Sequence, residues 1–113
     1  RSLVGSEMCI RDRVGAVVGE KLWRLARHHQ VLCVTHLPQL AGFGDTHFKV
    51  EKHVIGDRTV ARVARVEGEE RVAELAQMLG GTGRAAVQSA REILEYVARV
   101  KTGETARSAS RRR

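Results

Sequence analysis

Hydrophobic and polar positions in the first half of the chain follow two different spacings. Residues 14–29 carry apolar side chains at helical spacing, with charged residues between them. The predicted buried stripe of this helix consists of Val14, Val17, Val18, Leu22, Leu25 and Ala26. The run VLCVT at 31–35 has no polar alternation, which is typical of a central parallel strand covered on both faces. Pro38 suits the first turn of a short helix, PQLAG, because its missing N–H costs nothing there.

The second half of the chain predicts a hairpin and two helices. Two β-rich runs, 46–53 and 59–66, are joined through the turn signal Gly56-Asp57. The predicted helix over 67–81 has Gly80 at its C-cap, and its apolar face carries Val72, Leu75, Ala76 and Leu79. A last helix over about 84–101 buries Val87, Ala90, Ile93, Leu94 and Val97. Residues 102–113 are polar without periodicity, which predicts a disordered basic tail.

The predicted order of elements is α/β: helix, buried parallel strand, short helix, β-hairpin and two C-terminal helices. A single buried strand cannot satisfy its own hydrogen-bonding groups, so further parallel strands must lie beside VLCVT. The chain supplies few candidates for them. The pattern therefore predicts the second half of an α/β sheet whose first half is missing.

Charge and cysteine content narrow the function classes. The chain has 113 residues and a net charge of +7, with 20 Lys and Arg against 13 Asp and Glu. A basic balance of this kind favours acidic partners, chiefly nucleic acid. Cys9 and Cys33 form no disulfide framework, so a reducing cytosol is expected. No apolar run of about 18 residues occurs, so no membrane span is predicted.

His36 is the candidate functional residue, because it directly follows the predicted strand. In open α/β sheets, ligands bind beyond the carboxyl ends of the strands. A histidine there can donate a hydrogen bond to an anion, but it can also simply bond its own loop. The residues alone leave both interpretations open. His28, His29 and Cys33 lie nearby in the sequence, but no H-E-x-x-H or paired C-x-x-C occurs, so no metal site is predicted.

The first residues resemble something other than a natural domain. The stretch SLVGSEMCIRD at 2–12 resembles a translated sequencing-adapter peptide found at the ends of predicted proteins from metagenomic assemblies. It has neither a helical nor a strand period. We therefore expect residues 1–12 to be a non-native, disordered leader, and the domain itself to span residues 13–101.

A second resemblance carries a function. The stretch QVLCVTHLPQLAGFGDTHFKVEKHVIGDRTVARV at 30–63, followed by ERVAELAQMLGG at 70–81, resembles the C-terminal end of the RecN family. These bacterial DNA repair proteins are SMC-like, with an ABC-type ATPase head and a coiled coil. The resemblance implies that residues 13–101 form an incomplete second lobe of such a head. It also implies that His36 corresponds to the switch histidine, which approaches the γ-phosphate of ATP and helps to arrange the attacking water.

Most of an ATP site is absent from the sequence. No G-x-x-x-x-G-K-[ST] motif and no LSGGQ-like signature occurs, and GAVVGEKL at 15–22 has the wrong spacing for a phosphate loop. In this family the acidic Walker B residues should stand just upstream of Arg13. The resemblance thus implies ATP and Mg²⁺ as cofactors of the intact protein. We expect neither cofactor, and no ATPase activity, for the fragment alone.

Two function classes remain open. The first is a part of a RecN-type ATPase acting in recombinational repair of DNA double-strand breaks. Its implied partners are DNA, the missing N-terminal half of the head and a second copy of the parent protein, in the bacterial cytoplasm at the nucleoid and away from membranes. The alternative is a small basic nucleic-acid-binding module without enzymatic activity. The candidate DNA contacts in the tail are Arg107, Arg111, Arg112 and Arg113.

Overall fold

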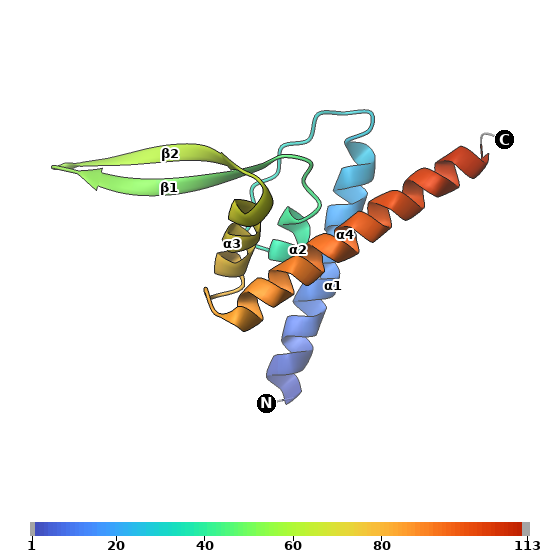
Figure 1. The fold of residues 1–113 in the computed structure, drawn as a ribbon, viewed down its shortest axis with the longest axis horizontal. Coiled ribbons are helices and arrows are strands. Elements are labelled where there is room, and N and C mark those ends of the chain that lie inside the picture. The colour runs from blue at the N-terminus through green and yellow to red at the C-terminus, as the bar shows by residue number, and fades with distance from the viewer. Residues whose placement is uncertain (1, 112–113) are drawn as a thin grey trace.

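The chain folds into helices and one antiparallel hairpin, as Figure 1 shows. This computed structural model describes the backbone of residues 2–111 and the side chains of residues 12–103. The elements in order are α1 (Ser2–Leu25), α2 (Pro38–Ala41), β1 (His47–Ile55), β2 (Arg58–Val66), α3 (Gly68–Met78) and α4 (Arg84–Arg111). The hairpin and the far end of α4 project in opposite directions from the remaining helices. Within the described part, neither long helix is apolar enough to cross a membrane.

The hairpin confirms the predicted pair of strands and their turn. The register pairs His47 with Val66 at one end and Ile55 with Arg58 at the other, so Gly56-Asp57 forms a two-residue turn. Gly56 has a φ of 62°, a conformation that glycine adopts without a Cβ clash. Side chains alternate between the two faces. One face leaves a set of large apolar side chains exposed, namely Phe48, Val50, Val54 and Val63.

The packed core lies between α3 and α4, on the faces that the apolar spacing predicts. Leu75 and Ala90 are both 0% exposed, and Val72 and Ala76 lie beside them. Helix α3 ends in a Schellman motif, in which the N–H groups of Gly81 and Gly80 donate to the carbonyls of Ala76 and Gln77 at 3.2 and 3.0 Å. Gly80 takes a φ of 107° one residue past the cap, so the predicted helix end is confirmed to within one residue.

Helix α1 does not bury the stripe that its sequence predicts. Val14, Val17 and Leu25 are 49–54% exposed. The buried face instead consists of Gly15 and Gly19, which lie one turn apart and pack against α2. A Cβ at Gly19 would stand only 2.6 Å from the Phe43 ring, so only glycine permits this approach. The prediction of a buried valine stripe is wrong for the chain by itself, because no other described element covers that side of α1.

The buried strand at 31–35 is a second prediction that the structure contradicts. These residues form no regular element and pair with no strand in the described part of the chain. Leu32 is 88% exposed and Val34 is 95% exposed. The physical reason is the one that the sequence implies: a parallel strand needs neighbours on both sides to bond its backbone and cover its side chains. The sheet described here contains β1 and β2 only.

The chain ends also differ from the sequence-based expectation. Helix α1 begins at Ser2, and α4 continues to Arg111, where the pattern predicts irregular chain. Both stretches adjoin an established helix and contain no proline, so extending the helix adds one hydrogen bond per residue without a new nucleus. The non-native origin of residues 1–12 stays a prediction.

Candidate functional site

The candidate site is the loop that leads from α1 to α2 and carries His36. After α1 ends, hydrogen-bonded turns run to His29, and residues 30–35 then lead to α2 as irregular chain. Cys33 is exposed and unpaired within this stretch. His36 is exposed as well. The structure therefore presents the histidine and the residues leading to it on an uncovered side of the molecule.

Local bonds fix the backbone on both sides of His36. The N–H of Leu37 donates to Oγ1 of Thr35 at 3.0 Å, which closes a tight turn around the histidine. Pro38 follows as the first residue of α2 and is buried. Proline holds φ near −65°, so it directs the chain into the helix. These contacts set the backbone direction at His36 and leave its ring accessible.

Arg71 of α3 holds the other end of α2. Its Nη2 donates to the backbone carbonyls of Ala41, Gly42 and Gly44 at 3.3, 3.0 and 2.7 Å. A cation there suits the negative end of a helix. Sequence reasoning missed this residue. The available signal was its spacing, because Arg71 precedes Leu75 by four positions and so shares the buried face of α3.

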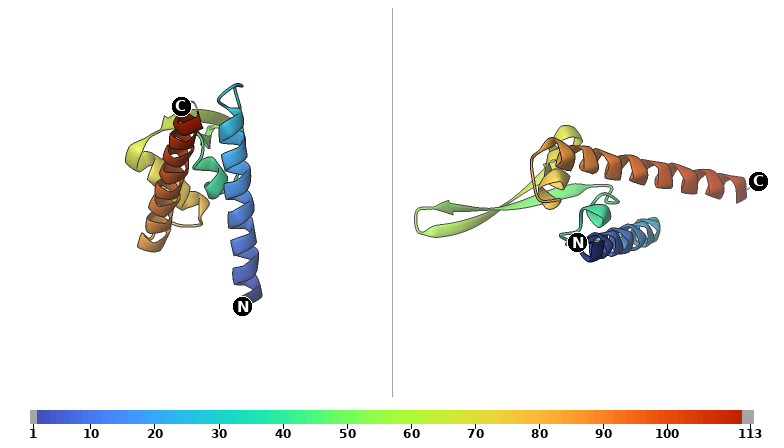
Figure 2. Two further views of the ribbon diagram at one scale, coloured as in Figure 1. Left: turned by 90° about the vertical axis from the view of Figure 1, so that its right-hand side faces the viewer. Right: turned by 90° about the horizontal axis from the view of Figure 1, so that it is seen from below.

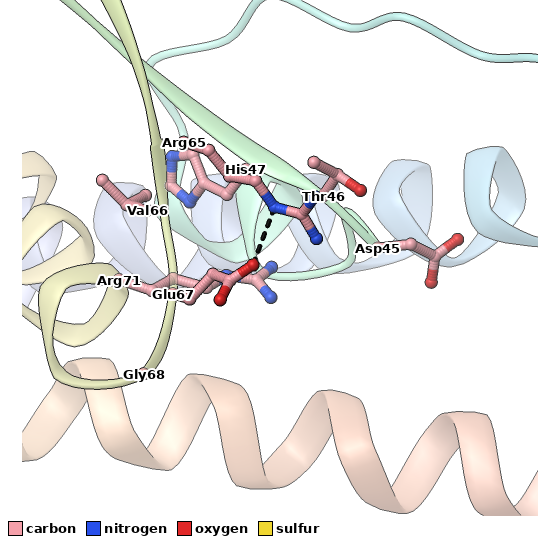
Figure 3. A pocket seen from close by; sticks show the side chains of 8 residues that line it. All are labelled: Asp45, Thr46, His47, Arg65, Val66, Glu67, Gly68 and Arg71. Atoms are coloured by element: carbon pink, nitrogen blue, oxygen red, sulfur yellow. Dashed lines mark ion pairs between the residues drawn. The ribbon is translucent and has the colours of Figure 1, made fainter.

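Arg71 also lines a polar pocket at the base of the hairpin, shown in Figure 3. The pocket has a volume of about 220 Å³ and is lined by Asp45, Thr46, His47, Arg65, Val66, Glu67, Gly68 and Arg71. An ion pair of 2.8 Å joins Arg65 Nε to Glu67 Oε1. His47 Nδ1 and Arg71 Nε are buried without a hydrogen-bond partner among the described residues. Burial lowers the pKa of His47, and the neighbouring Arg71 guanidinium lowers it further, against an opposing effect of Glu74.

The lowered pKa of His47 predicts a pH-dependent stability. The unfolded chain binds a proton at His47 at a higher pH than the folded chain does. The neutral ring therefore makes its full contribution to the free energy of unfolding above the ordinary pKa of 6.5. It is lost as pH falls below that value. Acidification should thus lower the free energy of unfolding more steeply in the wild type than in His47→Gln. Urea unfolding at several pH values measures the slopes. His53→Gln, on the same face of β1, is the matched control, and equal slopes for wild type and His47→Gln would contradict the expectation.

The other residues singled out by the sequence are not brought to His36 as a site. Among the described residues, no group of three His, Cys, Asp or Glu side chains could hold a metal ion. Arg107 and Arg111 lie on the last part of α4, where the backbone but not the side chains are described, and Arg112 and Arg113 lie outside the described residues. Their contact with DNA stays a prediction.

Comparison with known proteins identifies the family of the chain. No protein-family model matches the chain. The chain is 51% identical over 78 residues to the DNA repair protein RecN of Deinococcus radiodurans, a match covering 68% of the chain and 14% of that relative. It is 44% identical to RecN of Mycobacterium leprae and 36% identical to RecN of Bacillus subtilis, in each case over 95 residues, or 82% of the chain and 16% of the relative. The chain thus spans about one seventh of the length of these curated relatives. These matches show that the chain belongs to the RecN family of DNA repair proteins and corresponds to a C-terminal segment of it.

Proposed function

We propose that this chain is the C-terminal part of the ATPase head of a RecN-type protein, and that it supplies His36 to the ATP site. The observation that supports this most is the uncovered segment 30–35, which leads to an exposed histidine held between two local backbone constraints. Leu32 and Val34 are apolar and almost fully exposed, as expected for a strand whose neighbours belong to the rest of the head. Insertion of this segment into a sheet would bring His36 to the carboxyl edge, where ligands bind.

The chemistry of His36 in this proposal is positioning. During transfer of a phosphoryl group the protein itself forms few or no covalent bonds. Catalysis therefore depends on hydrogen bonds and charges placed around the γ-phosphate. An imidazole N–H of His36 would donate to the γ-phosphate or orient the attacking water. The described residues do not fit Mg²⁺ by themselves, because they gather no set of carboxylate or imidazole ligands. The phosphate cradle and the metal ligands are therefore assigned to the remainder of the parent protein, and we expect the chain alone neither to bind nor to hydrolyse ATP.

The partners follow from the same assignment. The exposed valines of α1 and the uncovered segment 30–35 would pack against the preceding half of the head. The relatives carry the name of DNA repair proteins, which supports DNA as the partner of the parent protein. On the family resemblance, we assign the parent protein to recombinational repair of double-strand breaks, with a homodimer as its working form. That role places it at the bacterial nucleoid.

A basic nucleic-acid-binding module remains the second candidate. The net charge of +7 and the exposed arginines of β2, Arg58, Arg62 and Arg65, favour it. Alternation along the strand divides these arginines between the two faces, and Arg65 is already paired with Glu67 at 2.8 Å. A binding module of this kind also gives no reason for an exposed apolar segment at 31–35. The ATPase-head assignment accounts for that segment directly.

The accessibility of Cys33 tests the proposed function. In the free chain, carrying Cys9→Ser, we expect Cys33 to react with a maleimide at the rate of the urea-unfolded chain, because it lies exposed in the uncovered segment. A chimera with residues 13–113 in place of the matching segment of the Deinococcus radiodurans relative should complete the sheet. Burial of the strand should then slow labelling at Cys33 by roughly 10-fold or more, in proportion to its local opening. Mass spectrometry of the Cys33 peptide measures both rates, and equal rates in the folded chimera and the free chain would remove the strand from the proposal.

A further inference from the structure

Helix α2 packs against three other helices, although it is very short. It contains four residues, Pro38–Ala41, and a helix of one turn does not form by itself in water. It packs against α1, α3 and α4, and the two views of Figure 2 show it lying between α1 and the other two helices. A Cβ at Gly42 would stand 2.8 Å from Cγ2 of Ile93 on α4, which shows how closely that side is packed. The orientation of α2 is therefore set by its neighbours.

Arg71 makes the polar contacts that hold α2 in place, and these contacts are called the anchorage of α2. Its three acceptors are the backbone carbonyls at the end of α2 and just beyond it. The side chain is half-buried, and burial lowers its pKa, with Asp45 opposing that effect. A guanidinium remains charged under these conditions, since its ordinary pKa lies far above neutrality. Loss of the side chain would leave carbonyl groups in a partly buried place without this donor.

The anchorage is mechanically linked to His36. The histidine stands two residues before Pro38, and the Thr35–Leu37 hydrogen bond of 3.0 Å leaves little backbone freedom between them. A rotation or shift of α2 would therefore move the backbone of His36 with it. Catalytic geometry is sensitive to such shifts, because a displacement of about 1 Å can reduce a rate by roughly 100-fold.

We propose that Arg71 is a positioning residue: by holding the three carbonyls at the end of α2, it fixes the orientation of His36 toward the γ-phosphate. The orientation of His36 toward the γ-phosphate, the catalytic half of the proposal, rests on the function proposed above. The hold of Arg71 on α2 and thereby on His36, the mechanical half, concerns this chain alone. Arg71 contacts neither substrate nor reacting atoms in this role. It acts through α2, which distinguishes it from a residue that only adds stability.

Hydrogen exchange on the complete chain tests the mechanical half. The amide N–H groups of Ala41, Gly42 and Phe43 bond within α2 or its cap. In Arg71→Gln and in the milder Arg71→Lys, we expect these amides to exchange at least about tenfold faster, and the His36 resonances to shift, while amides of the β1–β2 ladder change little. The control is Arg91→Gln, which removes an exposed pair with Glu69 at 2.8 and 3.0 Å. Unchanged protection of α2 in a folded Arg71→Lys variant would overturn the proposal, whatever the function of the chain.

Turnover by the chimera described above tests the catalytic half. We expect Arg71→Lys to lower kcat by roughly 10- to 100-fold with the KM for ATP little changed, because the loss is one of orientation. In a His36→Ala background the same substitution should lower kcat no further, because both changes act on the same contact between His36 and the γ-phosphate. A further loss of the same size in the double variant would show that Arg71 does not act through His36. If His36→Ala alone has no effect on turnover, the proposed function fails, and the exchange experiment still decides the mechanical link.

Discussion

Replacing Leu75 with alanine should lower the free energy of unfolding by about 2–5 kcal/mol, the usual cost of a cavity at a fully buried leucine. Leu75 is 0% exposed at the centre of the α3–α4 cluster, with Val72, Ala76 and Ala90 around it. A domain of this size has a modest total stability, so the loss is a large fraction of it. We expect Leu75→Ala to lower the urea midpoint strongly or to leave the chain largely unfolded at 37 °C.

The matched control is Leu32→Ala, which removes the same atoms from a side chain that is 88% exposed. Its cost should stay within about 0.5 kcal/mol in the free chain, as for other surface substitutions. Urea unfolding followed by circular dichroism compares the two variants under one condition. A cost for Leu32→Ala that equals that of Leu75→Ala would contradict the exposed position of the segment. In the chimera, burial of the strand should raise the cost of Leu32→Ala toward that of a core leucine.

The contrast between these leucines explains which elements the sequence predicts well. The hairpin and the α3–α4 pair are correct because their signals are local: a Gly-Asp turn, alternating strand residues, and two apolar stripes that meet within the chain. Leu75 finds its partners in the segment that follows it. Leu32 does not, because a parallel strand takes its neighbours from distant segments. The apolar pattern at 31–35 therefore predicts burial in a larger assembly, and the chain alone leaves those side chains exposed.

The residues of the candidate site also differ in how well local sequence signals identify them. His36 is found from the sequence because it ends an apolar run and lies in a recognisable stretch, THLPQ. Arg71 is not, since its three carbonyl acceptors lie 27–30 residues away along the chain and no local pattern connects them. The glycine face of α1 was missed for a related reason. Hydrophobic spacing identifies large apolar side chains, whereas Gly15 and Gly19 contribute to packing through the absence of a side chain.

Replacing His36 with alanine should have the largest functional effect of the substitutions proposed for this chain. The histidine is exposed and lies outside the α3–α4 core, so its removal should leave the fold of the free chain intact. In the chimera, we expect kcat to fall by roughly 100-fold, the scale seen when one hydrogen-bond donor to a transition state is removed. ATP binding should change far less, because the contact strengthens mainly as charge shifts on the γ-phosphate.

Single-turnover kinetics and ATP titration of the chimera separate these two quantities. His29→Ala is the matched control, because His29 is an exposed histidine at the opposite end of the same loop. Calorimetry of the free chain with Mg-ATP gives the baseline, which should show no saturable binding, since one histidine cannot replace a phosphate cradle and metal ligands. Micromolar binding by the free chain would contradict the division of the ATP site between two parts of the protein. Equal turnover in His36→Ala and wild-type chimeras would remove His36 from the mechanism. A fall in turnover in His36→Ala but not in His29→Ala would instead support a role for the uncovered loop in placing a hydrogen-bond donor at the γ-phosphate.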